Sequence, residues 1–206
     1  MEIMLDKKCE FILEKRLEFP DVVINQLRTP LTSYKSNGIP YILDNGAFSN
    51  FNEKKFTRMV NKSKEDQYCK FIVMPDVVGK AKKTLEQFYY FKDRYNIESS
   101  KCAFVLQDGA HKNLLPKWDE FQCLFIGGST KFKMSNIAFQ LSKIAKKNGL
   151  WVHVGRVNTP NRINKWFNFC DSIDGSGISR FDNMLEKAVK AIIQNKRYPQ
   201  KSIFEF

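Results

Sequence analysis

The sequence predicts an α/β fold, a compact (β/α)8 barrel that forms a single domain over residues 1–206. Short apolar runs alternate with amphipathic, lysine-rich stretches along the chain, which is the βαβ pattern of a parallel sheet. The runs Phe71–Met74 and Ala103–Leu106 are continuously apolar, as is typical of parallel strands covered on both faces. With 206 residues, 43% of them hydrophobic, the chain is long enough for one well-buried domain and short for two.

We expect each apolar run to form a strand of this barrel and each amphipathic stretch to form a helix around it. The candidate strands, eight in all, are Cys9 to Leu13, Asp21 to Gln26, Tyr41 to Leu43, Phe71 to Pro75, Cys102 to Leu106, Cys123 to Ile126, Trp151 to Gly155 and Asp171 to Asp174. The candidate helices are Glu53 to Asp66, Lys80 to Tyr95, Leu114 to Phe121, Met134 to Asn148, Thr159 to Phe169 and Arg180 to Asn195.

Two helix boundaries carry clear local signals. Thr159-Pro160 offers an N-cap followed by proline at the first helical position, and Asn148-Gly149 suits the end of the preceding helix. The tail from Arg197 to Phe206 either packs its aromatic residues under the barrel or frays, and the sequence leaves both possibilities open.

Cysteine usage and hydropathy predict a soluble, cytoplasmic protein. The five cysteines form an odd set without C-x-x-C spacing, which favours buried free thiols over a disulfide framework or a zinc cluster. No run of about 18 apolar residues is present, so we expect no membrane association. The N-terminus has acidic residues where a signal peptide has an apolar core.

The chain carries a net charge of +12, from 34 Lys and Arg against 22 Asp and Glu. Such a surface attracts polyanions, and nucleic acid is the obvious candidate. Charge alone speaks only to non-specific attraction, and lysine-rich helices are often simply solvated faces.

Polar residues end the predicted strands, and Asp174 is the most prominent of them. It ends a short predicted strand that also carries Asp171, and it precedes Gly175, where the backbone can turn and approach a ligand closely. The alternative is that Asp174 or Asp171 merely caps the next helix. Because the carboxyl ends of parallel barrel strands meet at one mouth, the other polar strand ends are expected around the same pocket: Asp44, Asp76, Gln107, Gly128 and Arg156.

This set of groups suits recognition of a guanine-like base. Carboxylates accept hydrogen bonds from N1–H and the exocyclic amine of guanine, while a glutamine amide and a glycine N–H donate to O6. A hard-cation site is the competing interpretation of clustered aspartates, but we expect no metal and no cofactor. The chain has two histidines, too few for a His-based zinc site, and His153 in an apolar strand is more often a satisfied core residue.

Six motifs, in order, give the chain a family resemblance that spans roughly Asp21 to Arg180. It resembles the tRNA-guanine transglycosylase superfamily, and is most similar to the small phage and bacterial branch that inserts deazapurines into DNA. The motifs are Asp44-Asn45-Gly46-Ala47-Phe48, Pro75-Asp76-Val77-Val78-Gly79, Gln107-Asp108-Gly109, Ile126-Gly127-Gly128, Val154-Gly155-Arg156-Val157-Asn158 and Asp171-Ser172-Ile173-Asp174-Gly175.

The resemblance implies a role for each matching residue. Asp174 matches the nucleophile that attacks C1′ and holds the sugar covalently, and Asp44 matches the general acid/base. The residues implied to read the base are Asp76, Gln107, Gly127 and Gly128. Arg156 and Arg180 are candidates for phosphate contacts, and Asp108, His153 and Asp171 are further candidate site residues.

Departures from the family shape the expected substrate. The tRNA enzymes carry a Cys-rich zinc subdomain that this chain lacks, and Asp108 stands where they have Gly. We therefore expect exchange of guanine in DNA for a 7-deazaguanine base such as preQ0, with tRNA the less favoured substrate. A homodimer or a partner subunit stays open.

Two other functions compete with this one. A base-releasing glycosylase or deoxyribosyltransferase would use the same aspartates but pass the sugar to water or another acceptor. A non-catalytic nucleic-acid-binding barrel would need only the positive charge, and the presence of Asp44 and Asp174 together argues against it because a buried unpaired carboxylate is costly.

Overall fold

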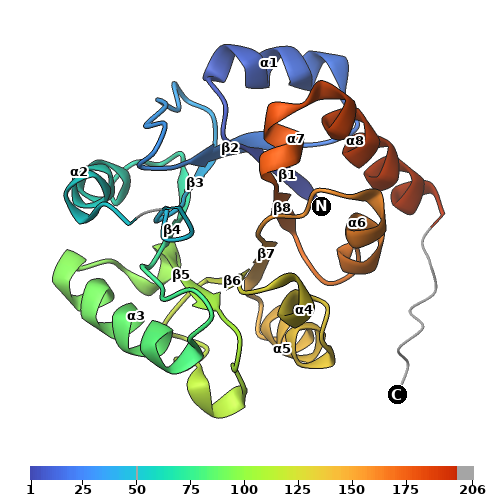
Figure 1. Cartoon of the computed structure of the whole chain (residues 1–206). Helices are drawn as coiled ribbons and strands as arrows, with labels where there is room; N and C mark the ends of the chain where they lie inside the picture. The colour runs from blue at the N-terminus through green and yellow to red at the C-terminus, as the bar shows by residue number, and fades with distance from the viewer. Residues whose placement is uncertain (50, 199–206) are drawn as a thin grey trace.

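The chain forms a closed ring of parallel strands surrounded by helices, as Figure 1 shows in a view along the barrel. In this computed structural model, the described residues are 1–49 and 51–198. Within them, eight strands pair in chain order, and β1 pairs with both β2 and β8. The predicted (β/α)8 barrel is confirmed. Most of the tail predicted at Arg197 to Phe206 lies outside the described residues.

The strands are short, and helices connect most of them. The strands are β1 (Glu2–Leu5), β2 (Ile24–Arg28), β3 (Tyr41–Leu43), β4 (Cys69–Val73), β5 (Cys102–Leu106), β6 (Cys123–Ile126), β7 (Trp151–Val154) and β8 (Ser172–Asp174). The helices are α1 (Cys9–Glu18), α2 (Glu53–Ser63), α3 (Ala81–Tyr95), α4 (Thr130–Lys133), α5 (Asn136–Lys147), α6 (Pro160–Trp166), α7 (Ser176–Arg180) and α8 (Asp182–Arg197), with 3-10 turns η1 (Ser99–Lys101) and η2 (Lys112–Leu114).

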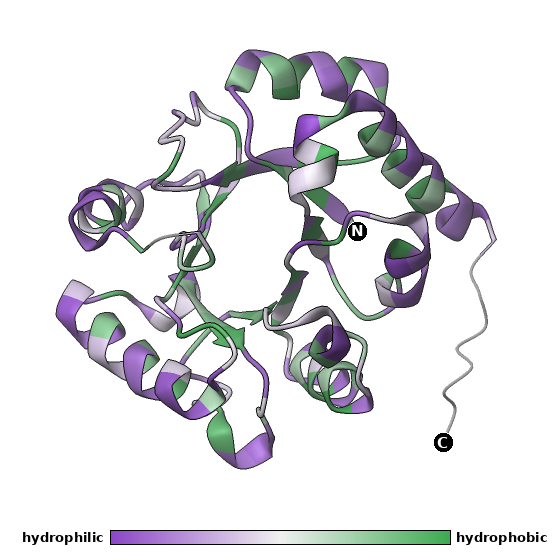
Figure 2. Ribbon diagram, viewed as in Figure 1, coloured by the Kyte–Doolittle hydropathy of each residue, from purple (hydrophilic) through white to green (hydrophobic). Residues whose placement is uncertain are grey.

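Strand residues divide between two apolar layers because successive side chains point to opposite faces. Ile3, Leu5 and Ile173 pack outward in the larger cluster, against the helices. Met4 belongs to the smaller cluster, together with Val73 and Phe125, which also line the pocket at the barrel mouth. Figure 2 shows hydrophobic residues along the strands and hydrophilic residues on the outward faces of the helices. The same alternation turns Asp174 into the barrel interior.

The prediction of a strand at Cys9 to Leu13 is wrong, because this run begins helix α1. The barrel's first strand is β1, which the sequence did not reveal. Cys9 and Ile12 are buried in α1, whereas Leu13 is half exposed, so the apolar run covers more than one helix face. Strand β1 is held in the barrel by its pairing with β2 and with β8, and β8 lies at the far end of the chain.

The prediction of a helix at Leu114 to Phe121 is also wrong. Only the 3-10 turn η2 (Lys112–Leu114) forms there, and Leu115 is extended. Leu115 precedes Pro116, and a residue before proline is pushed from the helical into the extended region. Helix formation therefore stops where the proline begins.

Most other predicted elements are confirmed with shifted ends. Strands β3, β5 and β6 have the predicted bounds. The stretch Met134 to Asn148 yields α5, which begins after a Ser135 cap on the amide of Ala138. Arg180 ends α7, and α8 begins only at Asp182.

The predicted free thiols are confirmed, since all five cysteines are buried and unpaired. Among the described residues, no helix is long and apolar enough to cross a membrane.

Phe88 of α3 gives a test of the packing between helix and barrel. It is fully buried and makes edge-to-face contacts with Phe104 and Phe121. We expect Phe88→Ala to lower the free energy of unfolding by about 3–5 kcal/mol, measured by urea denaturation. Tyr90→Ala on the same helix, where Tyr90 is 53% exposed, is the control and should cost far less.

Candidate active site

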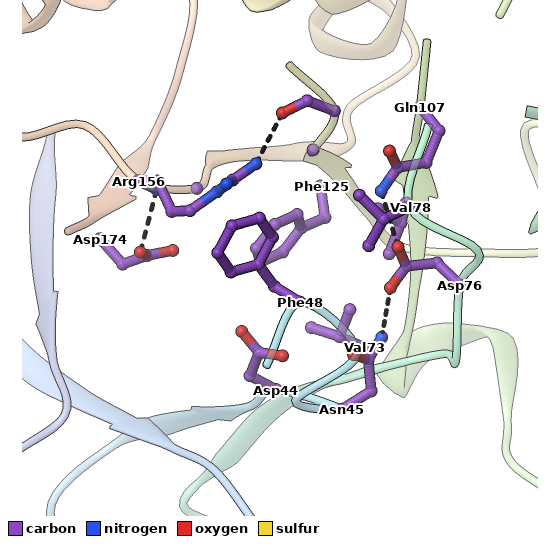
Figure 3. Close-up of a pocket in the computed structure, with 14 residues that line it drawn as sticks. Asp44, Asn45, Phe48, Val73, Asp76, Val78, Gln107, Phe125, Arg156 and Asp174 are labelled. Atoms are coloured by element: carbon purple, nitrogen blue, oxygen red, sulfur yellow. Dashed lines mark hydrogen bonds between the residues drawn. The ribbon is translucent and has the colours of Figure 1, made fainter. Parts of the chain in front are cut away.

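The carboxyl-terminal ends of the strands surround one pocket with a cavity of about 70 Å³. It brings together seven residues that the sequence singled out: Asp44, Asp76, Gln107, Gly127, Gly128, Arg156 and Asp174. Apolar side chains complete its walls, among them Phe48, Val73, Val105 and Phe125. Figure 3 shows Asp174 and Arg156 on one side of the pocket and Asp76 and Gln107 on the other.

Asp174, the last residue of β8, is held at both carboxylate oxygens. It is only 7% exposed. The backbone N–H of Arg156 donates to Oδ1 at 3.0 Å, and Nε2 of His153 lies 2.9 Å from Oδ2. The carboxylate therefore has a fixed orientation at the edge of the pocket.

His153 is oriented by a chain of hydrogen bonds along the barrel interior. The indole N–H of Trp151 donates to Ser172 Oγ at 2.8 Å, and Ser172 Oγ lies 2.8 Å from Nδ1 of His153. Because tryptophan can only donate, the serine oxygen accepts from Trp151 and its own hydrogen is free to bond Nδ1. In the tautomer that fits this chain, Nε2 of His153 carries a hydrogen and donates it to Asp174 Oδ2. His153 is a satisfied core histidine and a direct partner of Asp174.

Asp44 follows β3, and its carboxylate is the one most affected by its surroundings. Its Oδ1 accepts the N–H of Gly46 at 2.8 Å. Burial raises the pKa of Asp44 from 3.8 to about 7, the bond from Gly46 opposes this, and the negative charges of Asp174, Asp76 and Asp6 add to the rise. Near neutral pH this carboxyl group can both donate and accept a proton.

Asp76, after β4, is paired with two amide side chains. Asn45 Nδ2 donates to Oδ1 at 2.7 Å, and Gln107 Nε2 donates to Oδ2 at 2.6 Å. The N–H of Gly79 donates to Gln107 Oε1 at 2.9 Å, which fixes the amide orientation. Burial raises the pKa of Asp76 above its ordinary value, although both amide bonds oppose the rise.

The two residues after β6, Gly127 and Gly128, have no room for a side chain. A Cβ at Gly127 would lie 2.8 Å from Val105 Cγ1 and 2.9 Å from Gln107 Nε2. Gly128 has a φ of +75°, and a Cβ there would lie 2.5 Å from Asp108 Oδ2. Glycine at both positions lets the backbone come close to the amide of Gln107 and to the pocket.

Arg156 lies at the pocket rim in a left-handed backbone conformation, with a φ of 58°. Its Nη2 donates to the carbonyl oxygen of Gly128 at 2.7 Å. Its guanidinium also stacks on the ring of Phe48, 3.7 Å from the centroid, and Phe48 is 63% exposed. The guanidinium is thus part of the pocket wall.

Four predicted candidates lie outside the pocket lining: His153, which reaches the pocket only through Asp174, and Asp108, Asp171 and Arg180. Asp108 accepts from the N–H of Ser129 at 2.7 Å and from its hydroxyl; these bonds outweigh its desolvation and lower its pKa. Asp171 precedes β8, at the opposite end of that strand from Asp174, and bonds Lys146 and the N–H of Val152. Arg180 is exposed at the end of α7. Asp108 and Asp171 therefore serve the fold, and neither lines the pocket.

Sequence reasoning missed two charged residues beside the site. Asp6 follows β1, accepts a hydrogen bond from Thr32 Oγ1 at 2.6 Å, and has a pKa raised by burial and, to a lesser degree, by the charge of Asp174. The run Met4-Leu5-Asp6 has the pattern of the other strand ends, and would have been found had β1 been recognised.

Lys133 is the second charged residue beside the site that the sequence did not reveal. It is 4% exposed, and its Nζ donates to the carbonyl oxygen of Gly155 at 2.7 Å. Burial, with the charge of Arg156, lowers its pKa from 10.5 to about 8. It stands in a lysine-rich stretch, so no sequence signal separates it from exposed lysines.

Metal coordination has no obvious place here: within residues 1–49 and 51–198, no three His, Cys, Asp or Glu residues are grouped so that they could hold a metal ion.

Comparison with known proteins identifies the fold class. No family model matches the sequence, and no curated protein matches it. Among solved structures, KGPDC from Streptococcus mutans is similar with a TM-score of 0.52 and 9% identity, covering 95% of this chain and 96% of that one. A second crystal structure of the same protein, in complex with a ligand, gives a TM-score of 0.51, 9% identity, and coverage of 95% and 97%.

At this identity, the likeness establishes a (β/α)8 barrel and nothing about the reaction. The particular chemistry has to be argued from the pocket itself.

Burial and the neighbouring carboxylates disfavour the ionised form of Asp44, so we expect Asp44→Asn to raise the free energy of unfolding at pH 8. Because the pKa of Asp44 rises from 3.8 to about 7 on folding, its ionised form is disfavoured in the folded state, and stability is lost as pH rises from the unfolded pKa to the folded one. Asparagine keeps an oxygen for the Gly46 N–H. We expect a gain on the order of 2 kcal/mol at pH 8 and less at pH 5.

Thermal unfolding at both pH values measures this effect, with exposed Asp119→Asn as the control. Equal melting temperatures for Asp44→Asn and the parent protein at pH 8 would contradict the raised pKa.

Proposed function

We propose that the protein is a guanine transglycosylase that exchanges guanine in DNA for a 7-deazaguanine base through a covalent aspartyl intermediate. The observation that carries the proposal is the pocket's two-sided arrangement (Figure 3). A carboxylate held at both oxygens, Asp174, faces an amide and carboxylate pair, Gln107 and Asp76, across one cavity. A nucleotide whose base is read on one side presents its C1′ to the other.

The pair Asp76 and Gln107 matches the edge of guanine. Each oxygen of Asp76 already accepts one hydrogen bond, and a carboxylate oxygen can accept a second, from N1–H or the exocyclic amine. Gln107 Nε2 has two hydrogens, of which one points to Asp76, so the other suits O6. Phe48 and Phe125 give the flat base apolar walls.

The reaction uses two carboxylates in turn. Asp174 attacks C1′, the bond from C1′ to N9 breaks, and Asp44 protonates the departing guanine. The incoming deazaguanine then gives its N9 proton to Asp44 and attacks C1′, and Asp174 leaves as carboxylate. A pKa of about 7 for Asp44 is near the optimum for a group that acts as acid and then as base.

The charge pattern around the pocket supports a polyanionic substrate. Acidic residues line the pocket, while exposed cations occupy the segments that leave the strand ends, and the net charge is +12. A phosphate backbone can bind this rim while a base enters the acidic centre. These exposed cations include Lys8, Lys35, Lys80, Lys112, Lys131 and Arg180.

Exchange of labelled guanine into matched DNA and tRNA, with mass spectrometry of the nucleosides, tests the proposal. We expect exchange in DNA, weakening steeply with salt, and incorporation of preQ0 or a related base. Exchange confined to tRNA would overturn the DNA assignment. Release of guanine without incorporation would favour the base-releasing glycosylase, and DNA binding without either reaction would favour the non-catalytic barrel.

Replacing the two carboxylates separates their roles. We expect Asp174→Asn to abolish both exchange and the covalent DNA adduct, and Asp44→Asn to slow exchange by roughly 10² to 10⁴-fold. Adduct formation is followed by denaturing gel electrophoresis, with exposed Asp119→Asn as the control. Undiminished turnover by Asp174→Asn would exclude the covalent mechanism.

A further inference from the structure

Lys133 is a buried cation that the proposed reaction does not use. It ends the short helix α4 and is 4% exposed. A buried ammonium is costly unless it is bonded, and Nζ donates at 2.7 Å to the carbonyl oxygen of Gly155. The carboxylates of Asp174 and Asp108 favour its charge, while burial and the cations Arg156 and Arg162 oppose it.

The group that Lys133 bonds belongs to the same peptide that bonds Asp174. The carbonyl oxygen of Gly155 and the N–H of Arg156 are the two ends of one peptide unit. Lys133 donates to the first, and the second donates to Asp174 Oδ1 at 3.0 Å. Hydrogen bonds in such a chain polarise one another, so an ammonium at one end strengthens the bond to the carboxylate at the other.

The local backbone holds this peptide plane in place. Arg156 has a φ of 58°, a conformation uncommon outside glycine. A Cβ at Gly155 would lie 2.8 Å from the ring of Phe125, so only glycine lets the strand end pack there. Both constraints act on the Gly155–Arg156 peptide, the unit that Lys133 and Asp174 bond.

We propose that Lys133 is a positioning residue that controls Asp174 through the Gly155–Arg156 peptide. Its role in turnover rests on the proposed function, because that function makes Asp174 the nucleophile; the coupling itself does not. The protonated ammonium strengthens the Arg156 hydrogen bond, which orients the Asp174 carboxylate and stabilises it when it departs from the sugar. Loss of the ammonium proton weakens both effects.

Titration of the wild-type protein by ¹H–¹⁵N NMR tests the coupling without any reaction. Burial lowers the pKa of Lys133 to about 8, so the amide proton of Arg156 should shift upfield with a midpoint near pH 8. The control is the amide of Tyr68, which donates to Asp66 Oδ1 at 2.9 Å, a matched bond to a carboxylate at the opposite end of the barrel. We expect no transition at Tyr68 in this range.

Two variants identify the titrating group. Lys133→Met removes the ammonium and keeps an unbranched chain, so the Arg156 transition near pH 8 should disappear. Lys133→Arg keeps a charge that does not titrate there, so the Arg156 signal should stay at its low-pH position. An Arg156 amide that does not titrate near pH 8 in the wild-type protein overturns the proposal, whether or not either variant folds.

Turnover gives a second readout. We expect Lys133→Met to lower kcat for exchange roughly 5- to 10-fold at pH 7, and wild-type kcat to fall above pH 8 while Lys133→Arg resists the fall. Lys147→Met, at an exposed lysine of α5, is the matched control. Unchanged kcat and pH profile in Lys133→Met would overturn the positioning role. An NMR transition in a protein without exchange activity would refute the proposed function and leave the coupling standing.

Discussion

Pairing of the first strand with the last is the constraint on which the rest of the molecule depends. The register sets Met4 of β1 beside Asp174 of β8, which closes the ring and fixes the height of Asp174 relative to every other strand end. Closure also brings Asp6, just after β1, within the electrostatic reach of Asp174. An open sheet of the same strands would separate these two carboxylates by its full width.

Closure in turn confines four carboxylates, and the chain provides each with hydrogen-bond donors. Asp6 accepts a hydrogen bond from the hydroxyl of Thr32, and Asp44 accepts one from a backbone amide. Asp76 accepts hydrogen bonds from two side-chain amides, and Asp174 is bonded by His153 and a backbone amide. Burial still raises the pKa of Asp6, Asp44 and Asp76. The pocket is therefore a costly concentration of acidic groups, and the packing of the surrounding apolar layers offsets that cost in the free energy of folding. Such shifted groups are common at functional sites.

Sequence pattern was sufficient where a residue's environment is local. Continuous apolar strands such as β5, and polar residues directly after them, predicted the barrel and seven of the residues that line the pocket. It failed where the environment is made by distant parts of the chain: β1 pairs with β8, and Nζ of Lys133 bonds the carbonyl oxygen of Gly155, after β7. It also could not separate Asp108 and Asp171, whose partners Ser129 and Lys146 come from elsewhere in the fold, from aspartates that face the cavity.

The two hydrogen bonds to Asp174 have a consequence for entropy. A free carboxylate rotates about its own bond, and a reaction that needs one orientation must remove that freedom each time. Here His153 and the Arg156 amide have removed it already, so in the proposed reaction the loss is a cost of folding and does not recur with each substrate. Because the Asp174 carboxylate no longer rotates, only the approaching molecule has to be aligned with it. The walls of the pocket limit the directions from which that molecule can arrive.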